Sequence, residues 1–333
     1  MASDGDRGEV SQRLIPLAQI DSEDERFRIT TRRGNVDLLS SLQRIGLLAA
    51  PLVLPTENGF IIVSGFRRIA ACRELTWDVI PAKVLSRQTS EYECALRAIA
   101  ENSTERPLNL IETSRALALL DQHAPGGQVP LEDAAALGLT THPGLATKLK
   151  ALRRLPAEVQ AAVIAEAVSF PMACELGRLE ADLAVAFARL FRQLKTSLNK
   201  QKEILTLVSE IASREEMDPR EVLRDPALIR VLEMEELDRN QKTRHIRRLL
   251  RRRRFPSLVA AEDRFHALRQ RLKLGENLQL APPRDFEGTR FTLTLSFDSL
   301  MEIKRLRTKL DELAHHPDFK TLLTGKGVGF GEN

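Results

Sequence analysis

A change in the periodicity of the apolar residues near residue 90 constrains the fold of this chain more than any other feature. Before it, short apolar runs alternate with turn signals and short helical patterns. After it, apolar residues recur at helical spacing as far as about residue 272. Strands mixed with helices predict a small mixed α/β domain, and sustained helical spacing predicts an all-helical region. The predicted class of the whole chain is therefore α+β.

The first region has four predicted strands and two predicted helices. The Asn58-Gly59 pair predicts a hairpin between the second and third strands. Asn35 is the expected cap of the first helix, which Gly46 ends. The predicted strands lie within 13–20, 51–54, 60–63 and 80–85, and the predicted helices span about 36–45 and 66–75.

Later helices are marked by their starts and breaks. Ser90 with Glu93, and Asn109 with Glu112, have the spacing of helix N-terminal caps. Residues 123–130 contain Pro-Gly-Gly and a second proline, which predicts a loop between domains. The predicted divisions are a disordered tail at 1–12, an N-terminal domain at 13–122, a helical domain at 123–225, a basic helical region at 226–275 and a C-terminal segment at 276–333.

The C-terminal segment combines one strand with one helix. Residues 281–284 suggest a linker, residues 290–297 alternate strictly, and Asp298 is placed to cap an amphipathic helix. One strand and one helix do not make a stable domain alone. We therefore predict that this segment pairs with a second copy, and the alternative is that it docks on its own chain.

Composition is that of a globular protein with locally concentrated charge. The chain has 333 residues, 43% of them apolar, and a net charge of only +4. Three scattered cysteines form no CxxC pair, and no apolar run is long enough to span a bilayer, so we expect a cytoplasmic protein. Positive charge is densest at 242–254, where Arg247, Arg248, Arg251 and Arg252 are candidate phosphate contacts. The alternative is a solvated basic helix face.

The stretch Ser64-Gly65-Phe66-Arg67-Arg68 lies where a strand gives way to a helix. The first N–H groups of a helix have no partner within the helix, and its dipole favours an anion there. Gly65 permits close approach of the backbone, Ser64 offers a hydroxyl, and Arg67 and Arg68 offer guanidinium forks. The pattern indicates phosphate binding, with an ordinary surface turn as the alternative.

Glu101-Asn102 is a second candidate site. A carboxylate beside an amide oxygen suits Mg²⁺, which takes one or two protein oxygens and completes its shell with phosphates and water. Asn102 as a simple helix C-cap is the competing interpretation and, without further context, the favoured one.

Residues 131–154 have the pattern of a helix-turn-helix. Ala134 is followed four residues later by Gly138, which allows two helices to cross closely around a turn. The recognition helix is expected at 145–154, and the candidate DNA contacts are Thr141, Thr147, Lys148, Lys150, Arg153 and Arg154.

These three elements occur in an order that resembles the ParB family of partition proteins. Residues 64–68 resemble the family's Gly-Glu-Arg-Arg box, and Glu101-Asn102 with Leu108, Asn109 and Glu112 resemble its second box. Leu155-Pro156 and Val159 resemble the segment that follows the family's helix-turn-helix. The resemblance covers about residues 12–180.

The resemblance implies a DNA-binding protein of chromosome or plasmid segregation. It implies CTP with Mg²⁺ in the N-terminal domain, a clamp on a palindromic site, slow CTP hydrolysis, a homodimer, a partner ParA-type ATPase and a place at the nucleoid. By position, Gly65, Arg67 and Arg68 would hold the triphosphate, and Glu101 and Asn102 would hold the metal.

Three departures from the family pattern keep other functions open. Phe66 replaces a polar residue, Glu105-Arg106 reverses the usual order, and the loop before the recognition helix is about two residues longer. A DNA-binding regulator with a degraded nucleotide site is the second hypothesis. An enzyme on this fold, either a metal nuclease or a sulfiredoxin-like phosphotransferase, is the third. The phosphotransferase needs a cysteine in the turn, and Cys72 lies more than a helical turn away.

Overall fold

The computed structural model describes residues 10–32, 34, 36–127 and 129–324. The chain forms two compact units, Met1–Leu198 and Asn199–Asn333, which we take in turn. The predicted α+β class, with a mixed N-terminal domain and a largely helical remainder, is confirmed. The predicted divisions within the chain stay predictions. Residues 11 and 12 lie in a strand rather than in the predicted tail, and the rest of that tail falls mainly outside the described residues.

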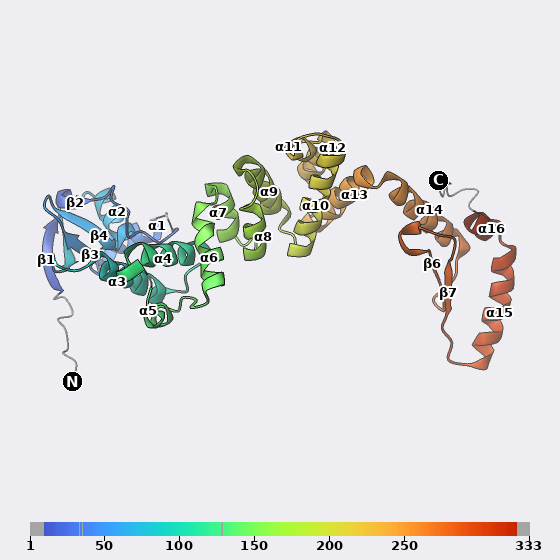
Figure 1. The fold of residues 1–333 in the computed structure, drawn as a ribbon, viewed down its shortest axis with the longest axis horizontal. Coiled ribbons are helices and arrows are strands. Elements are labelled where there is room, and N and C mark those ends of the chain that lie inside the picture. The colour runs from blue at the N-terminus through green and yellow to red at the C-terminus, as the bar shows by residue number, and fades with distance from the viewer. Residues whose placement is uncertain (1–9, 33, 35, 128, 325–333) are drawn as a thin grey trace. The chain divides into compact units, whose positions relative to one another are not determined.

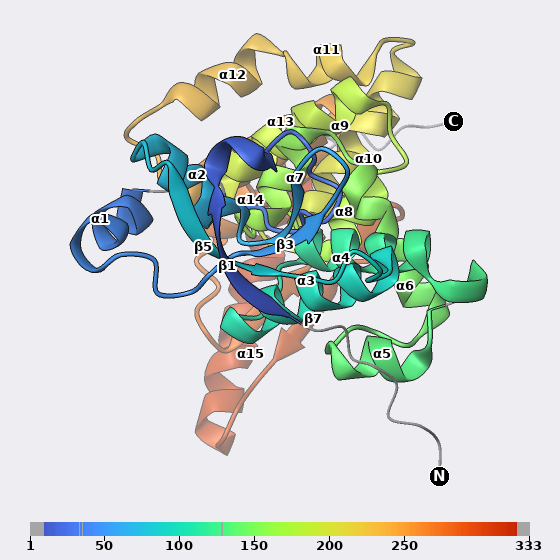
Figure 2. The same ribbon diagram turned by 90° about the vertical axis from the view of Figure 1, so that its left-hand side faces the viewer.

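A five-stranded mixed sheet lies in the N-terminal part of the first unit, with the strand order β1-β5-β3-β4-β2 (Figures 1 and 2). The pairs β1–β5 and β3–β4 are antiparallel, and β3–β5 and β2–β4 are parallel. The strands are β1 Ser11–Pro16, β2 Ile20–Asp21, β3 Leu52–Pro55, β4 Phe60–Ser64 and β5 Val79–Val84.

The predicted hairpin is confirmed by the antiparallel pairing of Leu54 with Ile61. Thr56 N–H closes the turn by donating to the Gly59 carbonyl at 2.8 Å. Gly59 has φ +144°, and a Cβ there would come 2.3 Å from the carbonyl oxygen of Gln19. Only glycine fits this turn, because the backbone of the 17–19 segment passes directly over it.

Nine α-helices complete the described part of the first unit. Helix α1 has the predicted range and ends at Gly46, whose N–H donates to the Leu42 carbonyl, while its expected cap, Asn35, lies outside the described residues. The helices are α1 Val36–Ile45, α2 Phe66–Glu74, α3 Glu91–Glu105, α4 Leu110–His123, α5 Leu131–Ala136, α6 Pro143–Ala151, α7 Ala157–Ile164, α8 Phe170–Leu176 and α9 Ala181–Leu194.

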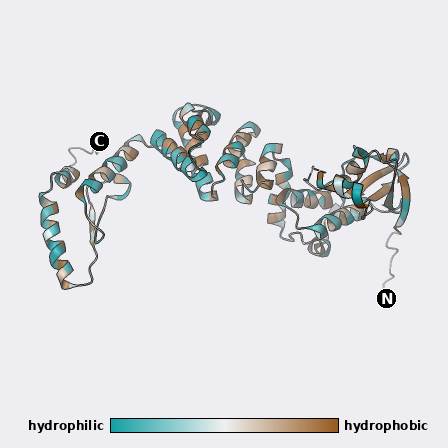
Figure 3. Cartoon of the chain, turned by 180° about the vertical axis from the view of Figure 1, so that it is seen from behind, coloured by the Kyte–Doolittle hydropathy of each residue, from teal (hydrophilic) through white to brown (hydrophobic). Residues whose placement is uncertain are grey.

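The apolar faces of the sheet, α1 and α2 form one core. Val53, Ile62, Ile69 and Ile80 are almost completely buried in it, and Figure 3 shows much brown along the strands of this unit. Both expected helix caps form: the Ser90 hydroxyl accepts from the N–H of Glu93, and Asn109 makes a full capping box with Glu112. The caps fix where α3 and α4 begin, and therefore which of their residues face the sheet.

The second unit is helical apart from one pair of antiparallel strands, which lies between α14 and α15 in the sequence. Its helices are α10 Leu198–Arg214, α11 Pro219–Leu223, α12 Pro226–Glu233, α13 Arg239–Arg254, α14 Pro256–Leu272, α15 Leu300–His315 and α16 Pro317–Thr324, and its strands are β6 Leu278–Ala281 and β7 Thr292–Leu295. No helix in the described ranges is both long and apolar enough to cross a membrane.

The C-terminal segment differs from its prediction in two ways. The alternating strand has a partner in its own chain, because β7 pairs antiparallel with β6, which the sequence pattern did not indicate. Ser299 rather than Asp298 caps α15, since its hydroxyl accepts from the N–H of Glu302. Leu313 of α15 is buried with Phe265 and Leu268 of α14, so the segment does dock on its own chain.

Candidate functional site

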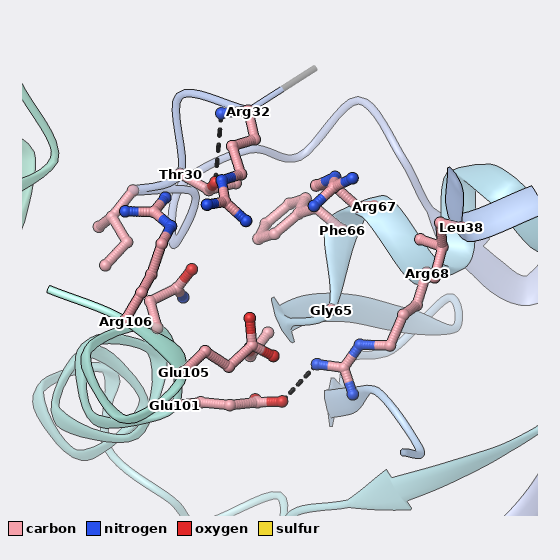
Figure 4. A pocket seen from close by; sticks show the side chains of 13 residues that line it. Thr30, Arg32, Leu38, Gly65, Phe66, Arg67, Arg68, Glu101, Glu105 and Arg106 are labelled. Atoms are coloured by element: carbon pink, nitrogen blue, oxygen red, sulfur yellow. Dashed lines mark hydrogen bonds and ion pairs between the residues drawn. The ribbon is translucent and has the colours of Figure 1, made fainter. Parts of the chain in front are cut away.

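A polar pocket lies at the junction of β4 and α2 (Figure 4). It is bounded by the first turn of α2, the last turns of α3 and the loop that precedes α1. The residues that line it are Ile29, Thr30, Arg32, Leu38, Ser64, Gly65, Phe66, Arg67, Arg68, Glu101, Asn102, Glu105 and Arg106. All six residues predicted to bind a nucleotide or its metal line this one pocket.

Gly65 makes the sharp turn from β4 into α2. It has φ +94°, in the left-handed region, and a Cβ would come 2.7 Å from Cβ of Pro51. Gly65 is the N-cap of α2 and has no side chain that could accept a hydrogen bond. The first N–H groups of α2 are therefore not capped by the side chain of their N-cap residue. These groups and the helix dipole favour an anion at the turn.

Arg67 and Arg68 are both held in place by backbone carbonyls. Arg67 Nη2 donates to the carbonyl of Gly34 at 2.7 Å, and its buried Nε has no hydrogen-bond partner among the described residues. Arg68 Nη1 donates to the carbonyl of Ala49 at 2.9 Å. A carbonyl satisfies hydrogen bonds without cancelling charge, so Arg67 keeps its positive charge at the pocket.

Glu101 supplies the opposite charge, because its carboxylate forms an ion pair with Arg68 Nη2 (Figure 4). The interpretation of Asn102 as the helix C-cap is wrong: α3 continues to Glu105, and Arg106 occupies the cap. Asn102 Nδ2 donates to the carbonyl of Ala98 at 2.8 Å. That bond turns the amide so that Oδ1 is the atom able to act as a ligand.

The reversed pair Glu105-Arg106 has a structural explanation. Arg106 makes a two-pronged ion pair with Glu112, with N–O distances of 2.7 and 2.6 Å. Glu112 is completely buried and also accepts from the N–H groups of Thr31 and Asn109. Burial raises the pKa of Glu112, but these bonds outweigh burial and lower the pKa to about 2. The carboxylate therefore anchors the pocket loop to the start of α4.

Phe66 gives the pocket one apolar wall. Its ring lies 5.8 Å from the guanidinium carbon of Arg28, a cation–π distance. Figure 4 shows the ring at the pocket between Arg32 and Arg67, while Glu105 lies beside Glu101 on α3. Arginines, two carboxylates and one aromatic ring suit a ligand that combines phosphate groups with a flat apolar ring.

The second predicted site, around α5 and α6, also forms within the first unit. Ala134 is buried, and Gly138 has φ +67° in the turn. Helix α6 begins at Pro143 with His142 as its cap, and a 3₁₀ turn at Leu152–Arg154 follows it. The recognition helix predicted at 145–154 is thus divided between α6 and a 3₁₀ turn, and Thr141 lies before α6.

Five of the six predicted DNA contacts of this region are exposed, and four of the five lie on α6 and the turn after it. These are Thr147, Lys148, Arg153 and Arg154. Lys150 is different: its ammonium forms an ion pair with Asp121 of α4, so it faces the neighbouring helix.

Comparison with known proteins matches residues 1–103 to the model of the ParB N-terminal domain. The chain carries a ParB N-terminal domain. A nucleoid occlusion protein of Lysinibacillus sphaericus is 32% identical over 134 residues, which are 40% of this chain and 43% of the relative. The chain thus spans less than half the length of that curated relative.

Solved ParB structures are also similar to this chain at low sequence identity. ParB of Caulobacter crescentus complexed with CTP-gamma-S is 22% identical, with a TM-score of 0.26, over 54% of this chain and 98% of that chain. The same protein complexed to the centromeric parS site is 21% identical, with a TM-score of 0.33, over 57% of this chain and 96% of that chain.

The ParB N-terminal domain also has pocket residues that sequence reasoning missed. Thr30 and Arg32 come from a loop without periodicity, and no local pattern marks them. Glu105 was noticed only as one half of a reversed pair. Cys72, considered for the phosphotransferase alternative, is completely buried, and burial raises the pKa of its thiol.

The four α13 arginines predicted to contact phosphates lie in the second unit, away from the ParB N-terminal domain in the sequence, and each has a carboxylate partner. Arg247 pairs with Glu203 of α10, and Arg251 pairs with Glu262 of α14. Arg248 and Arg252 share Asp263 of α14. These ion pairs bind α13 to its neighbours, so the helix is neither a bare phosphate-binding surface nor a simply solvated one.

Proposed function

We propose that this chain is a ParB-like, DNA-binding partition protein whose N-terminal pocket binds CTP with Mg²⁺. The observation that carries the proposal is the meeting of a glycine-initiated helix N-terminus, Arg67 and Arg68 with Glu101 in one pocket. A triphosphate needs such an anion site. The choice of cytosine rests on the family resemblance of the sequence.

In this proposal Ser64, Gly65, Arg67 and Arg68 hold the phosphates. The pocket fits Mg²⁺ by its donor set, since the Glu101 carboxylate and Asn102 Oδ1 are hard oxygen donors on adjacent residues of α3. When bound, the metal would neutralise phosphate charge. The described residues contain no group of three or more His, Cys, Asp or Glu able to hold a metal, so phosphate oxygens would complete the shell.

The Arg68–Glu101 ion pair makes the two ligands interdependent. A triphosphate that bound Arg68 without a metal would place its phosphates beside the negatively charged Glu101 carboxylate. A metal that bound Glu101 without a triphosphate would leave Arg68 without its counter-charge. Because each ligand satisfies the charge that the other uncovers, we expect metal and triphosphate to bind together.

DNA binding is assigned to α5, α6 and the turn that follows. The exposed Lys148, Arg153 and Arg154 supply positive charge on α6 and the 3₁₀ turn that follows it, which supports contact with phosphates or base edges. A palindromic DNA site requires a homodimer with two-fold symmetry. The further expectations, a sliding clamp, slow CTP hydrolysis, a ParA-type ATPase and a location at the nucleoid, follow from the family resemblance and belong to the proposal.

A DNA-binding nucleoid regulator without nucleotide control is the second candidate. Phe66 favours it by placing an apolar ring at the phosphate-binding turn. Arg106 favours it as well, because its guanidinium is committed to Glu112 rather than to the pocket.

Calorimetry with CTP, ATP, GTP and UTP in the presence of Mg²⁺ distinguishes the two. CTP-selective binding is expected. Arg68→Ala is expected to weaken it about 10- to 100-fold, the size of a hydrogen bond to a charged group, while DNA binding persists. A folded parent that binds DNA but no nucleotide contradicts the first function and favours the second.

A further inference from the structure

One arginine of α4 connects the wall of the pocket to the helix that follows the recognition segment. Arg115 Nη1 donates to the carbonyl of Thr30, which lines the pocket, at 3.2 Å. Its Nη2 donates to Gln160 Oε1 of α7 at 3.5 Å. The two partners are far apart in sequence, and both belong to the first unit.

Gln160 in turn holds the end of the recognition segment, which we define as residues 143–154. Its Nε2 donates to the carbonyl of Arg153 at 3.0 Å and to that of Leu155 at 2.8 Å. A continuous series of hydrogen bonds therefore runs from Thr30 through Arg115 and Gln160 to Arg153, a candidate DNA contact.

The neighbouring residue, Ser114, holds the same segment without reaching the pocket. It is completely buried, accepts from the N–H of Arg153 at 2.9 Å and donates to the carbonyl of Lys150 at 3.2 Å. Ser114 and Arg115 thus share the task of fixing the recognition segment, but only Arg115 also bonds to the pocket loop.

We propose that Arg115 is a positioning residue that couples occupancy of the pocket to the geometry of the recognition segment. The inference rests on the proposed function for the identity of the ligand. A guanidinium is planar with donors in a fixed fork, so a ligand that shifts the Thr30 carbonyl also reorients the donor to Gln160. By linkage, DNA that fixes Arg153 changes the affinity of the pocket by the same factor.

The test compares DNA affinity with and without CTP and Mg²⁺, using a duplex that the parent selects from a random pool. The ratio of the two affinities measures the coupling. Arg115→Met keeps the length of the side chain and removes every donor, so we expect its ratio to move at least about threefold toward one. Arg115→Lys keeps the charge but donates from one point only, and it is expected to behave likewise.

Ser114→Ala is the matched control. It loosens the recognition segment alone, so it should weaken DNA binding equally in both nucleotide states and leave the ratio unchanged. In a parent that binds CTP, a ratio of one overturns the proposal, and so does an unchanged ratio in both Arg115 variants or an equal shift in Ser114→Ala.

Amide hydrogen exchange with DNA alone separates this inference from the nucleotide function. DNA is expected to slow exchange at residues 30–32 in the parent and not in Arg115→Met. A parent that binds no nucleotide but shows this protection loses the nucleotide function and keeps the coupling. A parent that binds CTP without this protection keeps the function and loses the coupling.

Discussion

Arg68 and Glu101 line the same pocket from α2 and α3, and they form an ion pair in which each neutralises the other (Figure 4). The side chains are 14% and 33% exposed, so the pair is partly shielded from water. Any ligand that uses one of the two charges must also deal with the second.

Glu101→Gln should reduce the dependence of nucleotide binding on Mg²⁺. Without Mg²⁺, the variant should bind CTP about two- to fivefold more tightly than the parent, because Arg68 no longer has a competing carboxylate and such pairs are worth about 0.5–1 kcal/mol. With Mg²⁺, it should bind more weakly than the parent. Calorimetry with Mg²⁺ and with EDTA measures both. Glu57→Gln, in the exposed hairpin, is the control, and equal effects of the two variants would contradict the role of Glu101.

Glu112→Gln should destabilise the N-terminal domain by about 3–5 kcal/mol, because it leaves Arg106 in a shielded site without a counter-charge. Denaturant unfolding followed by the fluorescence of Trp77, the single tryptophan, measures this loss. Glu25→Gln, at an exposed pair, should change little.

Glu112 also makes the stability of the folded protein depend on pH. Its pKa in the folded protein, about 2, lies below the ordinary value of 4.5. The stabilisation is therefore fully present above about pH 4.5 and is lost as the pH falls toward 2. Glu112→Gln should flatten this acid limb. An acid limb identical to that of the parent would mean that other carboxylates govern it.

Lys148→Ala and Arg153→Ala should each weaken DNA binding and reduce its salt dependence by about one unit of slope, the effect of one lost phosphate contact. Fluorescence anisotropy at several salt concentrations gives both quantities. Arg189→Ala removes an exposed arginine of α9 that is paired with Glu158, and it serves as the control. Parental affinity in both test variants would place the DNA surface elsewhere.

Asp263→Asn should increase sequence-independent DNA binding. Asp263 holds both Arg248 and Arg252, whose side chains are already more than half exposed. Its loss frees two guanidinium groups, so the salt slope should steepen by about two. Glu287→Gln makes the same change in net charge outside α13 and α14. If both variants give the same slope, net charge explains the effect and the released arginines do not.

Met301→Asp should convert a dimer to a monomer. Docking of the C-terminal segment on its own chain leaves Phe297, Leu300 and Met301 53%, 78% and 65% exposed around the start of α15. Adjacent exposed apolar side chains suit an interface. Light scattering measures the mass, with Val36→Asp as the control at an exposed site in the first unit. A parent that is monomeric at all concentrations contradicts the predicted homodimer.

The sequence by itself determined the elements whose signals are local. The Asn-Gly hairpin, the end of α1 at Gly46 and the caps at Ser90 and Asn109 each depend on residues within one turn of one another. The turn at Gly65 belongs to this group, because its backbone conformation follows from neighbouring residues. The phosphate-binding candidates Ser64, Gly65, Arg67 and Arg68 were likewise predicted from one strand-to-helix turn, whereas the metal assignment of Glu101 and Asn102 also needed the family resemblance.

Only the tertiary structure decided which charges meet. Arg68 pairs with Glu101 across 33 positions, and the α13 arginines find carboxylates on α10 and α14. The strand β6 has no clear sequence signal of its own and is recognised by its antiparallel pairing with β7. The sequence specifies the charge of each side chain, but the ion-pair partner of that side chain depends on how the helices pack. Packing is set by the sum of many weak apolar contacts distributed along the chain.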